Sequence, residues 1–121
     1  YNLFKAIDGH VDFIITDGAL FHGHYYNLNN PNNTSNTEKT EAAISRWCSD
    51  FNNVNFFLER GGFEYEEEGR IQDYETAVSI DKWMRERLNS EEMSYAPIAW
   101  TDDVIDNVIT LVLKAHASPA Q

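Results

Sequence analysis

The sequence predicts an α+β protein in which a mostly antiparallel sheet carries helices packed on one face, in the order β-β-β-α-β-β-α-α. Two Asp-Gly pairs separate β-prone runs in the first third of the chain. Three later segments repeat apolar residues at helical spacing. We expect residues 1–121 to form a single compact domain, with a polar loop at 27–36 and a tail at 118–121.

The first third of the chain has the pattern of a β-meander. Asp-Gly favours two-residue hairpin turns, because both residues tolerate a positive φ. A two-residue turn also fixes the strand register, which places His22 and His24 on one sheet face and His10 on the other. The three expected strands are residues 1–7, 11–16 and 19–26.

Three helices are indicated by capping residues that precede apolar stripes. Ser35 and Glu38 match a capping box for a helix that runs to about Asp50. Asp73 is a suitable N-cap for a second helix, and Thr101 for a third. Two further strands are expected at residues 54–58 and 63–66, and a connector with Pro97 at 91–99.

The charge balance excludes several classes of partner. Nine basic residues stand against twenty acidic ones, which gives a net charge of −11. Nucleic-acid phosphates and anionic membranes both require a basic surface, so we expect neither as a direct partner. No apolar run approaches the ~18 residues that a membrane span needs.

The string Phe21-His22-Gly23-His24-Tyr25 is the segment that most strongly indicates a metal-binding or catalytic site. On a strand, the two histidines of a His-x-His triplet share a face, with Cα atoms ~6–7 Å apart. That arrangement suits a shared zinc ion, so His22 and His24 are the candidate metal ligands.

The same string resembles the His-Gly-His-x-Tyr motif of the 6-pyruvoyl-tetrahydropterin synthase family. The resemblance covers five residues. It implies a catalytic zinc bound by two strand histidines and a third histidine from an earlier strand, for which His10 is available. The family also carries a nucleophilic cysteine a few residues before the motif, where this sequence has Gly18 and Ala19.

Acidic residues concentrate in the second half of the chain. Fourteen acids and five bases lie between Glu59 and Asp106. Such a segment is either a solvated face that maintains solubility or a docking surface for a basic partner. Aromatic residues among the carboxylates favour docking. The candidate partner-binding residues are Glu64, Tyr65, Glu66, Glu67, Glu68, Asp73 and Tyr74.

Three classes of function follow. The first is a small acidic binding or inhibitor protein, similar in its physics to immunity proteins, antitoxins and nucleic-acid mimics, that engages a basic protein partner. The second is a zinc-dependent enzyme or metal-binding protein that uses the His-Gly-His string. The third is a processed secreted effector or toxin chain. The sequence contains no nucleotide-binding loop or nucleophile elbow, so no catalytic residue is assigned.

Two features bear on the cellular compartment. The single cysteine, Cys48, lies on the apolar stripe of a predicted helix, where a buried inert thiol is expected. Asn32-Asn33-Thr34-Ser35 holds two overlapping glycosylation sequons, at Asn32 and Asn33. Together with the start at Tyr1 rather than Met, the sequons leave both a cytoplasmic and a secreted origin open.

Overall fold

The computed structural model describes residues 1–61, 66 and 68–118. Contacts between residues divide the chain into two compact units, Tyr1–Asn53 and Val54–Gln121, and each unit is described by itself. No helix in the described part of the chain is long and apolar enough to cross a membrane.

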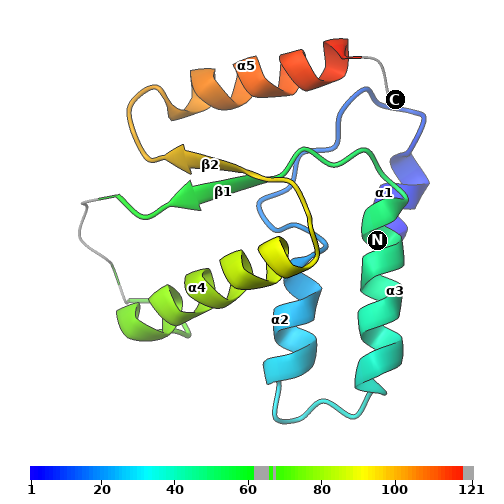
Figure 1. The fold of residues 1–121 in the computed structure, drawn as a ribbon, viewed down its shortest axis with the longest axis vertical. Helices are drawn as coiled ribbons and strands as arrows, with labels where there is room; N and C mark the ends of the chain where they lie inside the picture. The colour runs from blue at the N-terminus through cyan, green and yellow to red at the C-terminus, as the bar shows by residue number, and fades with distance from the viewer. Residues whose placement is uncertain (62–65, 67, 119–121) are drawn as a thin grey trace. The chain divides into compact units, whose positions relative to one another are not determined.

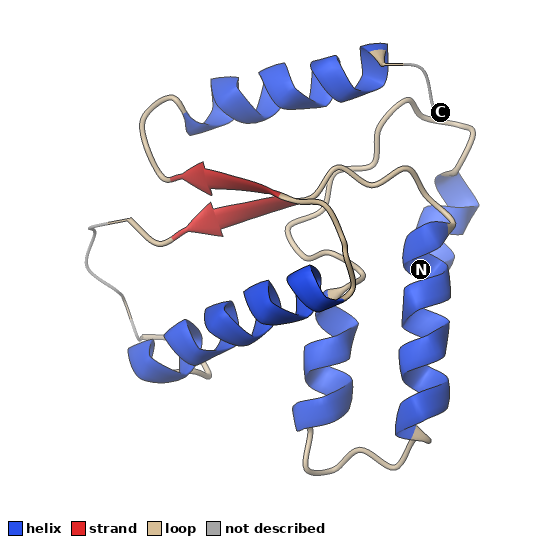
Figure 2. Ribbon diagram, in the orientation of Figure 1, coloured by secondary structure: helices blue, strands red, loops and turns tan. Residues whose placement is uncertain are grey.

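The first unit consists of helices and extended segments (Figures 1 and 2). Helix α1 spans Asn2–Ile7, α2 spans His22–Asn29 and α3 spans Thr37–Ser49. The short loop between α2 and α3 makes them a helical hairpin, in which the two helices contact each other. Asn36 caps α3 by accepting a hydrogen bond from the Lys39 backbone N–H, one residue later than the expected cap Ser35.

The predicted β-meander is wrong, and so is the mostly antiparallel sheet. Residues 1–7 and 19–26 overlap helices α1 and α2. The first Asp-Gly pair ends a helix instead of turning a hairpin. Asp8 is the C-cap of α1, and Gly9 follows with φ +79°. A glycine with positive φ is as typical of a helix C-terminus as of a hairpin turn. Residues 11–16 have no strand partner among the described residues.

Helices α2 and α3 approach closely at Gly23. A Cβ atom at this position would lie 3.0 Å from Cδ1 of Ile44, which is itself a buried residue of α3. Glycine usually weakens a helix interior by about 1 kcal/mol relative to alanine. Its presence here is explained by the space that Ile44 occupies.

The second unit is a β-α-β motif followed by a helix (Figure 2). Strand β1 (Phe56–Glu59) pairs in parallel with β2 (Ala96–Ala99), with Phe56 opposite Ala96 and Glu59 opposite Ala99. Helix α4 (Tyr74–Ser90) lies between them in sequence, as a parallel pair requires. Helix α5 (Val104–Ala117) contacts β2. Among the described residues of this unit, the buried core consists of Ala77, Met84, Leu88 and Ile98.

The expectations for this unit are partly confirmed. Asp73 caps α4 by accepting a hydrogen bond from the Thr76 backbone N–H, as predicted. Helix α5 is present, although its N-cap is Asp103 rather than Thr101. The connector expected at 91–99 contains β2, and the strand expected at 54–58 overlaps β1. The strand expected at 63–66 lies largely outside the described residues.

Pro97 lies within β2, and the register shows how the strand accommodates it. The Ala96 backbone N–H donates to the Asn55 carbonyl, so the backbone groups of Ala96 face β1. Because these groups alternate along a strand, those of Pro97 face the opposite edge. The missing N–H of proline therefore removes no bond from the β1–β2 ladder.

The close approach at Gly23 predicts a non-additive pair of substitutions. Gly23→Ala should destabilise the protein, because overpacking at Ile44 costs about 1–3 kcal/mol and outweighs the gain in helix propensity. Ile44→Val removes Cδ1 and alone should cost about 0.5–1.5 kcal/mol. In the Ile44→Val background, Gly23→Ala should be neutral or stabilising. Urea unfolding of the four proteins measures the coupling, and purely additive effects would contradict the proposed contact.

Candidate functional site

The most buried polar side chain in the described part of the chain is His24 on α2, which has 0% exposure. Its Nδ1 lies 2.5 Å from Oε2 of Glu41 on α3. Because a carboxylate accepts hydrogen bonds, Nδ1 carries the proton and donates it. The ring edge of Phe21 packs against the imidazole at a centroid distance of 4.8 Å. Nε2 is buried and has no hydrogen-bond partner among the described residues.

Glu41 also binds Asn27, and this contact extends the network to the loop between α2 and α3. Nδ2 of Asn27 donates to Oε1 of Glu41 at 2.8 Å and to the Thr37 carbonyl at 3.2 Å. Oδ1 of Asn27 accepts hydrogen bonds from Nδ2 of Asn33 at 2.9 Å and from Oγ of Ser35 at 3.2 Å. The Asn27 amide is thus fully satisfied, and it joins α2, α3 and the loop.

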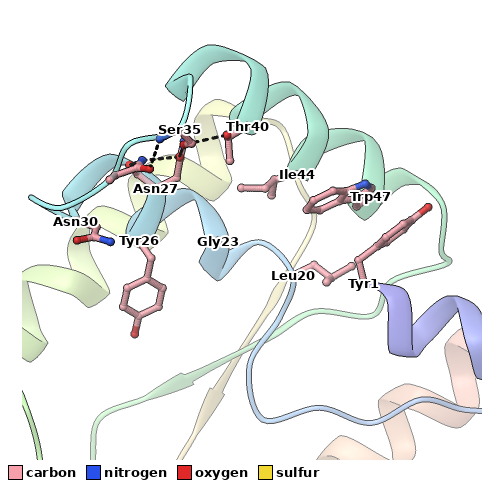
Figure 3. Close-up of a pocket in the computed structure, with 11 residues that line it drawn as sticks. Tyr1, Leu20, Gly23, Tyr26, Asn27, Asn30, Ser35, Thr40, Ile44 and Trp47 are labelled. Atoms are coloured by element: carbon pink, nitrogen blue, oxygen red, sulfur yellow. Dashed lines mark hydrogen bonds between the residues drawn. The ribbon is translucent and has the colours of Figure 1, made fainter.

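A groove of about 360 Å³ lies beside this network (Figure 3). Figure 3 shows amide and hydroxyl side chains at one end and apolar and aromatic ones, including Trp47, at the other. Tyr1 stacks on Trp47 at a centroid distance of 5.0 Å, and its hydroxyl donates to Asp50, which raises the pKa of Tyr1. The lining contains no charged residue: Tyr1, Leu20, Gly23, Tyr26, Asn27, Asn30, Asn33, Ser35, Thr40, Ile44 and Trp47.

The two predicted metal ligands do not form the expected pair. His22 and His24 lie two residues apart on a helix, where side chains do not face each other. His24 is buried against Glu41, whereas His22 is exposed. Partial burial of the imidazole lowers the pKa of His22, and the Asp17 carboxylate opposes that shift.

The strand geometry from which the zinc site was inferred is therefore wrong. His10 is exposed in the turn after α1. No group of three or more His, Cys, Asp or Glu side chains suited to a metal occurs within residues 1–61, 66 and 68–118. Zinc binding stays an untested prediction. Cys48 is a buried free thiol of α3, as expected.

The predicted partner-binding residues fall into two groups. Glu64, Tyr65 and Glu67 lie outside the described residues. The others belong to the second unit. Glu66 and Glu68 are exposed, Asp73 caps α4, and Tyr74 is half-exposed as the first residue of that helix.

Most basic side chains of the second unit are neutralised by neighbouring acids. Arg87 pairs with Glu91 at 2.9 Å, and Arg85 lies 3.8 Å from Glu59 while its guanidinium covers the Phe57 ring. Two further pairs are Arg60–Asp81 and Lys82–Glu86. In the described part of the unit, eight exposed acids have no ion-pair partner: Glu66, Glu68, Asp73, Glu75, Glu92, Asp102, Asp103 and Asp106.

Comparison with known proteins gives no further guidance. No protein family matches the chain, and no curated protein or solved structure is significantly similar to it. The resemblance of the His-Gly-His string to a zinc enzyme family thus has no support beyond the five residues that carry it.

The network around Glu41 predicts a large local loss of stability. Glu41→Ala leaves the buried His24 N–H without an acceptor, which should cost about 1–3 kcal/mol. Glu38→Ala is the matched control on the same helix. Glu38 is exposed in the first turn of α3, so only its interaction with the helix dipole, about 0.3–1 kcal/mol, is lost. Hydrogen exchange of α2 and α3 amides measures both, and equal effects would contradict a structural role for Glu41.

The cap of α4 predicts a specific dependence on pH. The hydrogen bond from Thr76 lowers the pKa of Asp73 below its ordinary value of 3.8. Because the pKa of Asp73 is lower in the folded state, the charged cap stabilises the protein at pH values above the ordinary pKa. This stabilisation is lost as the pH falls through the lowered pKa of the folded state. At pH 7, Asp73→Ala should lower the urea midpoint of the protein more than Asp73→Asn, which keeps the accepting oxygen.

The same reasoning predicts how the urea midpoints compare in acid. As the pH falls through the lowered pKa of Asp73, the carboxylate takes up a proton, so the urea midpoints of the wild-type protein and the Asp73→Asn variant should converge. Circular dichroism during urea unfolding at pH 7 and in acid tests this. A difference between wild type and Asp73→Asn that persists unchanged in acid would rule out the charged cap as its source.

Proposed function

We propose that the protein is a small acidic binding protein whose second unit engages a basic protein partner. One observation carries the proposal: local ion pairs hold the basic residues Arg60, Lys82, Arg85 and Arg87, while eight exposed carboxylates in the described part of this unit have no ion-pair partner. The unit holds fourteen acidic and six basic residues, a net charge of −8 of the total −11. Its surface potential is therefore negative, because few basic side chains are left to offset the exposed carboxylates.

The physics of such a surface suits rapid recognition of a cationic partner. Carboxylates that are not paired internally steer a basic protein toward the surface, and the effect weakens as salt shortens the Debye length from ~10 Å at 0.1 M. Exposed aromatic residues within the same unit, Tyr74 and Trp100, offer contact area of the kind found at interface hot spots. Immunity proteins, antitoxins and inhibitors that mimic nucleic acid use this combination.

The groove of the first unit is less suited to this role. Its lining is uncharged, and the first unit carries a net charge of only −3. A basic partner gains little electrostatic attraction there. The acidic residues of the two units can therefore be compared directly as separate sources of attraction.

A pair of matched triple variants tests the proposal. Glu66, Glu68 and Glu75 are replaced by Lys in one variant, and Asp8, Asp12 and Asp17 in the other, so both change the net charge equally. The probe is immobilised poly-L-lysine at about 50 mM salt. The first variant should associate roughly 3- to 150-fold more slowly than wild type, since three attractions of about 0.2–1 kcal/mol each are lost. The second should change less than about 2-fold.

The salt dependence provides the second readout. The wild-type rate should fall steeply with ionic strength, and the difference between the two variants should disappear near 1 M salt, where the Debye length is ~3 Å. If both variants slow equally while circular dichroism shows both folded, the acidic face has no directional role and serves solubility alone.

A further inference from the structure

The loop between α2 and α3 carries two overlapping sequons that differ sharply in their surroundings. In Asn32-Asn33-Thr34 the acceptor is Asn32, and in Asn33-Thr34-Ser35 it is Asn33. N-linked glycosylation attaches a bulky, hydrophilic glycan to the side-chain amide nitrogen Nδ2. The modified nitrogen keeps a single hydrogen, and the glycan must extend into solvent. The two asparagines can therefore be compared by what their Nδ2 atoms contact.

The Nδ2 atom of Asn33 is already committed to the fold. It donates to the Asn27 carbonyl at 2.7 Å and to Oδ1 of Asn27 at 2.9 Å. These two contacts use both of its hydrogens. The Asn33 residue is half-buried, and its Oδ1 accepts a hydrogen bond from the Ser35 backbone N–H. A glycan here would break at least one bond and would be directed toward Asn27, the residue that joins α2, α3 and the loop.

Asn32 is in the opposite situation. The residue is exposed, and its side chain makes no hydrogen bond among the described residues. Its backbone N–H donates to Oδ1 of Asn30 at 3.0 Å, which holds the loop backbone in place without using the Asn32 amide. The Nδ2 atom of Asn32 is therefore accessible, and a glycan on it leaves the network around Asn27 intact.

We propose that Asn32 is an N-glycosylation site of this protein and that Asn33 is incompatible with glycosylation in the folded first unit. The modifying group is a carbohydrate transferred from a lipid-linked pyrophosphate donor when the chain passes through a secretory compartment. The bond between the sugar C1 and the pyrophosphate breaks, a C1–Nδ2 bond to Asn32 forms, Nδ2 loses one proton, and the lipid pyrophosphate leaves. This inference concerns the first unit and is independent of the acidic surface of the second unit.

Single substitutions separate the two sequons. Thr34→Ala removes the Asn32 sequon but keeps the Asn33 sequon, because the middle position of a sequon accepts any residue except proline. Ser35→Ala removes only the Asn33 sequon. The full chain is expressed behind a secretory leader in a glycosylating eukaryotic cell, and the secreted protein is mapped by peptide mass. Wild type and Ser35→Ala should carry one glycan at Asn32, and Thr34→Ala should carry none.

A stronger acceptor at Asn33 provides the control for sequon efficiency. The double variant Thr34→Ala/Ser35→Thr places threonine at the third position of the Asn33 sequon. Its secreted fraction should be unglycosylated, and any fraction modified at Asn33 should unfold at a lower temperature than the unmodified chain. An empty Asn32 in secreted wild type would overturn the proposal. So would a glycan at Asn33 that leaves the melting temperature unchanged.

Discussion

The fold of the first unit depends on one carboxylate, Glu41. Helix α2 has a single fully buried residue, the histidine at position 24, so it lacks the broad apolar face that usually holds a helix in place. Glu41 compensates by accepting hydrogen bonds from two side chains of α2 at once. Through Asn27 the same carboxylate also fixes the loop. The packing of α2 against α3, the conformation of the loop and the walls of the groove therefore all depend on the Glu41 carboxylate.

The second unit is built on a different physical basis. Within its described part the buried residues are apolar and come from α4 and β2, and most of the charged side chains are exposed. Exposed carboxylates contribute little to the stability of such a core. Charge on this surface can consequently change without loss of the fold, which is the property a docking surface requires. In the first unit, by contrast, polar residues hold the structure and are less free to change.

The parts of the fold that the sequence predicted correctly are those fixed by local chemistry. Asp73 is followed by an apolar stripe, and the cap and the helix are both present. The hairpins failed because positive φ at Gly9 serves a helix end, and because β-prone residues form a strand only beside a partner. The site was missed because His24 and Glu41 are seventeen residues apart in the sequence, and neither has a local signal for the other.

Because of Pro97, the two edges of the sheet formed by β1 and β2 differ in the backbone N–H groups that they present. On the outer side of β2 the proline supplies no N–H, so another extended chain cannot form a regular ladder there. On the outer side of β1, Phe56 and Leu58 direct their backbone N–H and C=O groups away from β2, and neither residue is a proline. The backbone N–H groups that a further strand would need are therefore present at the β1 edge and missing at Pro97 on the β2 edge.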